Sequence, residues 1–375
     1  MTDVQAQVQS CLDDLVGRGV ERGLQVTAYL DGEQVVDAWA GVADPATGRP
    51  VDGETLFTVF SCTKGVTATV IHQLAERGAL DYDTAVAAYW PEFGAHGKER
   101  ITVRHVLSHT AGVPQMPAGG QPTDMADWDG ICRKIADLTP LWEPGTATGY
   151  HGLTYGFILG EVARRVDGRA IAQIVQEDIC QPLGIASLFF GVPDAAESRV
   201  APLENDRTID DAPAPPPDSY FERAMPGLRF SNVSFNLPEI RRASIPAAGG
   251  IMNARSLARH YAALVGDGVH GVRLLTQDRV KIATTLQTDA DDLVLGMPGR
   301  KALGYTLGGP LSPFSVRMTA FGHSGYGGAT GFADPEYRLA FALARNRLAF
   351  AAPDESAANI VASAVRAALD IPEVG

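Results

Sequence analysis

Short strand-like runs gather at the two ends of the 375-residue chain, and this distribution limits its fold more than any other feature. Near the N-terminus, the runs 24–30 and 33–40 flank Asp31-Gly32, a pair typical of a type I′ hairpin turn. Near the C-terminus, four more runs are separated by Gly, Pro and Asp, at 303–307, 314–321, 329–333 and 339–344. We therefore expect the two ends to build one sheet together.

The middle of the chain is mostly helical. Apolar positions recur with helical spacing at 131–138, 153–166 and 171–179, and also at 4–15 and 360–369 near the ends. This pattern predicts a sheet covered by helices, with a helical domain inserted between its two halves. We place the sheet domain at 1–60 and 300–375 and the mainly helical domain at 61–299, with the active-site cleft between them.

The charge balance bears on partners and location. A net charge of −13 opposes the approach of polyanions, so neither nucleic acid nor a membrane surface is an expected partner. The first residues lack the basic and apolar pattern of a secretory signal, and no apolar run is long enough to cross a bilayer. We expect a cytoplasmic protein. The four cysteines form no C-x-x-C pair, which predicts buried thiols.

Ser61 and Lys64 are the first candidates for chemistry. They lie at the start of a helical pattern that Gly78 would end. Residues three apart share a helix face, so the Lys64 amine can reach the Ser61 hydroxyl. Lysine acts as a base for an alcohol only where burial or a neighbouring charge lowers its pKa. The short S-x-x-K pattern is also typical of an N-cap serine followed by a solvated lysine.

Tyr150 is the second candidate. A loop rich in Pro and Gly, 142–152, delivers this tyrosine just before a helix that begins near Leu153. Its phenol is suited to relay a proton between Ser61, Lys64 and a leaving group. The alternative is a packed loop tyrosine with an exposed hydroxyl.

The glycine-rich segment 321–328 is the third candidate. Its glycines allow close approach to a substrate, its N–H groups suit an oxyanion hole, and His323 adds polarity. The alternative is a glycine-rich turn with a surface histidine. A nucleophile elbow centred on Ser324 is not predicted, because position 326 is tyrosine and no helical pattern follows.

The histidines outside these segments favour structural roles. We interpret His109 as a helix-end histidine that bonds backbone, with a role as base as the alternative. The others lack the spacing of metal ligands, so we expect no metal and no cofactor.

Together, in this order and spacing, these segments resemble the serine beta-lactamase and penicillin-binding-protein superfamily. The resemblance is class C-like and greatest to the family VIII carboxylesterases and related transacylases. It covers nearly the whole chain and rests on 60–64, 106–113, 144–150, 247–250 and 322–335. It implies an α+β, beta-lactamase/transpeptidase-like fold, in which an antiparallel sheet from both terminal segments carries an inserted all-helical domain.

The resemblance also implies roles. Ser61 would be the nucleophile, Lys64 and Tyr150 the proton-transfer pair, and the backbone N–H groups of Ser61 and Tyr326 the oxyanion hole. The remaining implied positions contact substrate: His151, Gly152, His323, Ser324 and Gly325.

Two departures from the family pattern weaken lactam recognition. Tyr150-His151-Gly152 replaces Y-x-N, which removes the side-chain amide that grips a lactam, and His323-Ser324-Gly325 replaces K-T-G, which removes a permanent cation. The resemblance therefore implies a serine hydrolase that acts on small-molecule carboxylic esters through a Ser61 acyl-enzyme. The alternatives are a transacylase using an alcohol or amine acceptor, a beta-lactamase or D-alanyl carboxypeptidase, and a non-catalytic binding module. The oligomeric state stays open.

Overall fold

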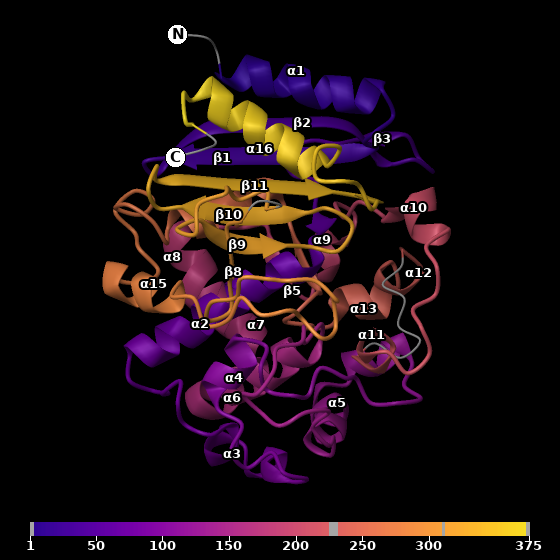
Figure 1. Ribbon diagram of the computed structural model, residues 1–375. Helices are drawn as coiled ribbons and strands as arrows, with labels where there is room; N and C mark the ends of the chain where they lie inside the picture. The colour runs from indigo at the N-terminus through magenta and orange to yellow at the C-terminus, as the bar shows by residue number, and fades with distance from the viewer. Residues whose placement is uncertain (1–3, 225–231, 310–311, 373–375) are drawn as a thin grey trace.

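A seven-stranded antiparallel sheet joins the two ends of the chain in the order β3-β2-β1-β11-β10-β9-β8. The computed structural model describes residues 4–224, 232–309 and 312–372 (Figure 1). The strands are β1 (Gly23–Leu30), β2 (Glu33–Asp44), β3 (Arg49–Pro50), β8 (Thr306–Leu307), β9 (Phe321–Ser324), β10 (Thr330–Asp334) and β11 (Leu339–Arg345). The expected α+β fold with a sheet from both terminal segments is confirmed.

The junction between the two halves of the sheet is the pairing of β1 with β11, which runs from Leu24 opposite Arg345 to Leu30 opposite Leu339. The turn from β1 to β2 has φ of 53° at Asp31 and 79° at Gly32. Two positive φ angles in succession are those of the predicted type I′ turn, whose twist matches that of the strands.

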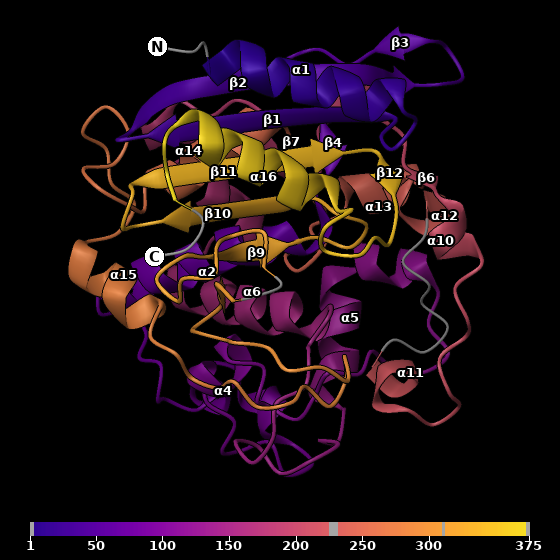
Figure 2. The same ribbon diagram turned by 45° about the horizontal axis from the view of Figure 1, so that its top comes forward.

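Helices cover both faces of the sheet. On the outer face, α1 (Val4–Gly17) and α16 (Ala357–Ala368) lie side by side over the strands, as Figure 2 shows. Their buried side chains form an apolar core with those of β1, β2, β10 and β11. On the inner face, α14 (Ala254–Ala262) packs against β1, β10 and β11, while α2 (Thr63–Glu76) lies next to β9.

The rest of the chain packs below the sheet as short helices and two small sheets. The longest helix there is α6 (Thr154–Asp167), which packs against α2 and ends at Gly168 with a left-handed φ of 89°. The other α-helices are α3 (Val86–Tyr89), α4 (Val103–Leu107), α5 (Trp128–Ala136), α7 (Ile171–Ile174), α8 (Gln181–Leu183), α9 (Asp194–Glu197), α10 (Arg207–Asp210), α11 (Tyr220–Ala224), α12 (Asn232–Phe235), α13 (Pro238–Arg242) and α15 (Gln277–Ala283). Two 3₁₀ helices, Pro91–Gly94 and Pro122–Ala126, and a π-helix, Val175–Cys180, lie among them. The small sheets are β4 (Phe57–Thr58), β7 (Gly250–Met252) and β5 (Leu188–Phe190), and β12 (Arg347–Leu348) with β6 (Glu204–Asn205).

Two predicted strands differ from the structure. The run 314–321 forms turns up to β9, which begins at Phe321, because Val316 and Met318 lie 43% and 44% exposed on a surface loop. The run 303–307 contributes only Thr306 and Leu307, because Gly304 turns the chain with a φ of 84°. Apolar content alone does not distinguish such loops from strands.

Cys11 is only partly buried, in contrast to the other three cysteines, and all four thiols are free. Within the described ranges, none of the helices has the length and apolar character to cross a membrane. The cytoplasmic location and the division into domains at 60 and 300 stay predictions.

Candidate active site

Ser61 lies in a single 3₁₀ turn, Phe60–Cys62, between β4 and α2. Its neighbours Phe60 and Cys62 are buried, whereas Ser61 is partly exposed. Phe60 has a φ of 46°, a left-handed conformation that costs a bulky residue roughly 1–3 kcal/mol. The fold holds this strained turn so that the hydroxyl of Ser61 is presented at the surface.

Lys64 is one turn further along and is completely buried. Its Nζ lies 3.1 Å from Ser61 Oγ and donates to two backbone carbonyls, Gly152 O at 2.8 Å and Ala247 O at 2.9 Å. The strand that follows Ala247 is fixed to α2, because Thr63 Oγ1 accepts from Gly250 N–H at 2.9 Å. Lys64 is therefore held by three partners from three parts of the chain.

The protonation state of Lys64 follows from this burial. Desolvation lowers the pKa of the amine well below its usual value, and none of its three partners is a carboxylate. A neutral amine has two hydrogens and one lone pair. The two carbonyls accept two hydrogens, so in the neutral amine the lone pair is left to accept from the Ser61 hydroxyl, as a base requires.

Tyr150 reaches the same hydroxyl from the other side. Its phenol donates to Ser61 Oγ at 2.7 Å, and its ring centroid lies 4.7 Å from Lys64 Nζ. Burial raises the pKa of this phenol, so it carries its proton at neutral pH. The structure thus brings Ser61, Lys64 and Tyr150 together in one hydrogen-bonded group.

Strand β9 runs beside the Ser61 turn. Cys62 Sγ donates to His323 O at 3.2 Å, and a Cβ atom added to Gly325 would lie 2.2 Å from Val59 O. Only glycine permits this approach. Ser324 at the end of the strand is exposed, and Gly325 is partly exposed beside it.

His323 is neutral at physiological pH. Its side chain is 6% exposed, its Nδ1 lies 2.9 Å from Ser324 O, and burial lowers its pKa to about 3. It therefore supplies polarity at this strand but no cation.

Tyr326 follows at the edge of the site. Its ring lies 5.8 Å from the ring of Phe60 and 5.4 Å from that of Phe350, which is 49% exposed. The contact with Phe60 brings Tyr326 next to the Ser61 turn, and the three rings form an aromatic wall there.

His151 and Gly152 face the interior. His151 is fully buried, with Nδ1 2.7 Å from Gly149 O and Nε2 accepting from Val113 N–H at 3.1 Å. The ring is thus oriented by backbone on both sides and is not directed at a substrate. Gly152 contributes the carbonyl that holds Lys64. The expected substrate contacts at these two positions are positioning contacts in the structure.

His109 is a structural residue of the kind expected. It follows α4 with a φ of 60°, and its Nδ1 accepts from His151 N–H at 3.0 Å. Its ring packs 4.9 Å from that of Tyr150.

Sequence reasoning missed Asp292 and Lys301. Both are buried, they pair at 2.8 Å, and Asp292 accepts from Tyr150 N–H at 3.0 Å. Asp292 lies 142 residues from Tyr150, and no local pattern marks either residue of the pair.

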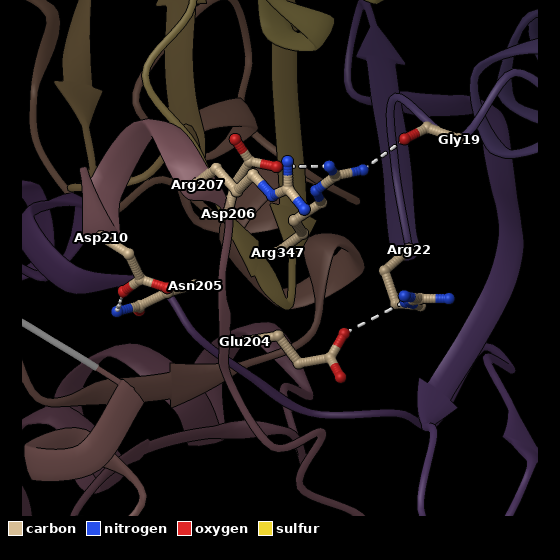
Figure 3. A pocket seen from close by; sticks show the side chains of 8 residues that line it. All are labelled: Gly19, Arg22, Glu204, Asn205, Asp206, Arg207, Asp210 and Arg347. Atoms are coloured by element: carbon tan, nitrogen blue, oxygen red, sulfur yellow. Dashed lines mark hydrogen bonds and ion pairs between the residues drawn. The ribbon is translucent and has the colours of Figure 1, made fainter. Parts of the chain in front are cut away.

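A cavity of about 600 Å³ lies elsewhere, beside β6 and β12 (Figure 3). Its walls are polar and already paired, with Arg22 3.1 Å from Glu204 and Arg347 bonded to Asp206. Neither Ser61 nor Tyr150 lines it. In the described part of the chain, no three His, Cys, Asp or Glu side chains gather as metal ligands would.

Comparisons with known proteins show the family to which the chain belongs. A family model described as Beta-lactamase matches residues 8–366. Esterase/beta-lactamase LipL of Mycobacterium tuberculosis is 37% identical over 346 residues, 87% of this chain and 77% of that protein. A solved family VIII carboxylesterase has a TM-score of 0.89 and 33% identity, covering 97% of both chains. A penicillin-binding protein homologue from Caulobacter crescentus has a TM-score of 0.88 and 36% identity, covering 98% of both.

Proposed function

Because this chain belongs to the beta-lactamase family of serine hydrolases, we propose that it cleaves carboxylic esters through an acyl-enzyme on Ser61. The observation that carries the assignment of the nucleophile is the position of Ser61 Oγ, 3.1 Å from a buried lysine amine and 2.7 Å from a phenol. An alcohol needs such a base to attack a carbonyl, and two proton-transfer groups on one hydroxyl serve both halves of acyl transfer.

Acylation begins at Lys64. As Ser61 Oγ attacks the ester carbonyl, its proton moves to the lone pair of Lys64 Nζ. The backbone N–H groups of Ser61 and Tyr326 stabilise the tetrahedral anion, a contribution that is often worth several kcal/mol in acyl transfer. Support for this pair comes from the contact between the Phe60 and Tyr326 rings, which places the two segments side by side.

The leaving alcohol takes its proton from Tyr150. The Lys64 ammonium then lies 4.7 Å from the ring and stabilises the phenolate left behind. In the second half of the cycle, a water molecule loses a proton to this phenolate and attacks the acyl-enzyme. Proton transfer from water has restored the neutral phenol. When the second tetrahedral anion collapses and releases the acid, Ser61 Oγ takes its proton back from the Lys64 ammonium, which restores the neutral amine.

The neutral His323 favours esters over lactams. A substrate with a carboxylate gains most from a fixed cation at this strand, and a histidine whose pKa is about 3 does not supply one. His151 is buried with both ring nitrogens bonded to backbone, so it does not replace the missing amide. Ser324, Gly325 and the aromatic wall are left to contact an uncharged ester.

The test compares a neutral ester with a lactam. We expect the wild-type protein to hydrolyse benzyl butyrate with a kcat/KM at least about 10-fold above that for nitrocefin, and Ser61→Ala to lower ester turnover about 10⁴-fold or more. Undiminished ester turnover by Ser61→Ala would overturn the assignment of the nucleophile. A preference for nitrocefin would overturn the choice of substrate class.

Transfer of the acyl group to an alcohol or amine uses the same intermediate. Water and the acceptor compete for the acyl-enzyme, and the outcome depends on which of them the site admits. Adding an alcohol to the ester assay separates the two functions. A new ester that grows with alcohol concentration at the expense of the acid identifies a transacylase, and an unchanged product ratio identifies a hydrolase.

A further inference from the structure

Tyr150 lies in a segment without regular secondary structure, between Leu141 and the start of α6 at Thr154. Backbone hydrogen bonds hold this segment at single points, such as Gly149 N–H to His109 O at 3.0 Å, whereas the N–H of Tyr150 itself bonds a side chain. Proton transfer nevertheless needs the phenol within hydrogen-bond distance of Ser61 Oγ, and a displacement of about 1 Å costs roughly 10²-fold in rate. Other groups must therefore set the position of Tyr150.

The carboxylate of Asp292 meets this requirement. Its Oδ1 accepts three backbone N–H groups, from Tyr150 at 3.0 Å, Val294 at 2.9 Å and Leu295 at 2.8 Å. Its Oδ2 lies 2.8 Å from Lys301 Nζ. One side chain thus joins the loop 292–295 to the backbone of the proposed proton donor.

Lys301 holds the same segment two residues earlier. Its Nζ donates to Thr148 Oγ1 at 3.0 Å, and the carbonyl of Thr148 accepts from Leu293 N–H at 2.9 Å. The side chains of Asp292 and Lys301 are 1% and 8% exposed. The pair is therefore poorly screened by solvent, and it bonds the Thr148 hydroxyl on one side of Gly149 and the Tyr150 N–H on the other.

The loop 292–295 also packs directly against the segment that carries Tyr150. A Cβ atom added to Gly149 would lie 2.5 Å from the Trp142 ring and 3.1 Å from Val294. The lack of a side chain at Gly149 lets the loop that carries Asp292 pack directly on the segment that carries Tyr150.

We propose that Asp292 is a positioning residue that holds the Tyr150 phenol on Ser61 Oγ, and that Lys301 stabilises the Asp292 carboxylate in the interior. This inference rests on the proposed function, because it assigns a catalytic consequence to where Tyr150 is held. It assigns no contact with substrate to either residue. The acceptor oxygen at position 292 sets the position of Tyr150, and the Lys301 charge neutralises that carboxylate in the interior.

If the ion pair only supports folding, its removal should lower stability and leave kcat unchanged. Two double variants separate this structural role from the positioning role. Replacing a buried pair by apolar groups of similar size is often neutral for stability, so Asp292→Leu with Lys301→Met retains the fold but has no acceptor. Asp292→Asn with Lys301→Met also removes both charges, yet its amide oxygen still accepts from Tyr150 N–H.

We expect the Asp292→Leu double variant to hydrolyse benzyl butyrate with kcat lowered about 10- to 100-fold and KM changed less than about threefold. The Asp292→Asn double variant should keep kcat within about fivefold of wild type. Melting temperatures of both establish that each is folded. Equal kcat values for the two folded double variants would overturn the proposal.

A matched control lies on the far side of the sheet. Arg317 and Asp334 also form a buried pair, at 3.2 Å with side chains 8% and 0% exposed. Asp334→Leu with Arg317→Met should change the melting temperature and leave kcat per folded molecule unchanged; a comparable fall in kcat would contradict a specific role for Asp292. Ester turnover that survives Ser61→Ala would instead remove the proposed function itself, so the two failures are distinguishable.

Discussion

Lys64 has the two properties that a base for serine needs, and both come from where it lies. Complete burial favours the neutral amine, and two backbone carbonyls accept its hydrogens, which leaves the lone pair available to the Ser61 hydroxyl 3.1 Å away. The sequence predicts the contact with Ser61, because residues three apart on a helix meet whatever else the chain does. It does not predict the burial, since that depends on the carbonyls of Gly152 and Ala247, 88 and 183 residues away.

Lys64→Arg tests the need for a neutral base. A guanidinium stays protonated at all accessible pH values, so we expect kcat/KM for a neutral ester to fall about 10³-fold or more. In the wild-type protein, kcat/KM should rise with pH through the lowered pKa of Lys64, because the amine must lose its proton to act as a base. This rising limb of the pH profile should be absent in Lys64→Arg. Initial rates across a pH series measure both.

Lys98 provides the control for burial of a lysine. It is also fully buried, and its Nζ also donates to backbone carbonyls, but it lies away from Ser61. Lys98→Arg should change stability and leave the pH limb in place. A limb that persists in Lys64→Arg would show that another group titrates.

The predictions for two neighbouring residues of the site, Tyr150 and His151, had different outcomes. Tyr150 was predicted from its place in the loop 142–152, and the structure puts its phenol on Ser61 Oγ. His151 was expected at the substrate, but its ring bonds Gly149 O and Val113 N–H in the interior. The direction of a loop side chain depends on its tertiary partners, and a single sequence does not contain that information.

At the scale of elements, the approach of β9 to the Ser61 turn decides the shape of the site. This approach depends on Gly325, where any side chain meets the carbonyl of Val59. The glycines of 321–328 predicted close approach to a substrate, which stays a prediction. The structure shows that Gly325 permits a close contact within the protein, with the carbonyl of Val59. The prediction of a strand over 314–321 was wrong, because Val316 and Met318 lie in an exposed loop.

Gly325→Ala is expected to move the end of β9 away from the Ser61 turn. The added methyl group must displace backbone rather than a flexible side chain, so kcat for a neutral ester should fall about 10- to 100-fold and the protein should lose roughly 1–3 kcal/mol of stability. Steady-state kinetics and urea unfolding measure the two effects.

Gly17→Ala is the comparison, because a Cβ atom there meets nothing within 4 Å. It should leave kcat unchanged and should not lower stability, because alanine is the better helix former at the end of α1. If Gly325→Ala behaves like Gly17→Ala, the strand is not held at the distance that the structure gives.

At the scale of the whole molecule, the sheet is the part that the sequence predicts best. The hairpin at Asp31-Gly32 and the short apolar runs near the C-terminus are local signals, and the pairing of β1 with β11 joins them. Burial of histidines is a property of the assembled molecule that no local pattern predicts. The histidines that the fold keeps uncharged are His72, His109, His151, His260 and His323, whose pKa values are all lowered by burial.

These histidines predict a loss of stability in mild acid. Their folded pKa values lie below the unfolded value of about 6.5, so between the two the unfolded chain binds more protons. Each fully buried histidine then removes about 1.4 kcal/mol of unfolding free energy per pH unit below about 6.5. Glu21 opposes this, because burial raises its pKa to about 7 and the folded state binds a proton first.

With five histidines against one glutamate, the urea midpoint should fall between pH 6.5 and pH 5. His260→Gln should make this fall shallower, since it removes one titrating group that lies outside the active site. A midpoint that stays constant or rises on acidification would contradict the burial of these side chains as neutral groups.

The mass of the intact protein during turnover of butyrate esters reports whether Ser61 carries the acyl group. Acid quenching within the first turnovers should trap one butyryl group per wild-type molecule, and peptide mapping should place it on Ser61. Ser61→Ala should carry none and should not hydrolyse the ester. A butyryl group on another residue, or ester turnover by Ser61→Ala at the wild-type rate, would contradict the account.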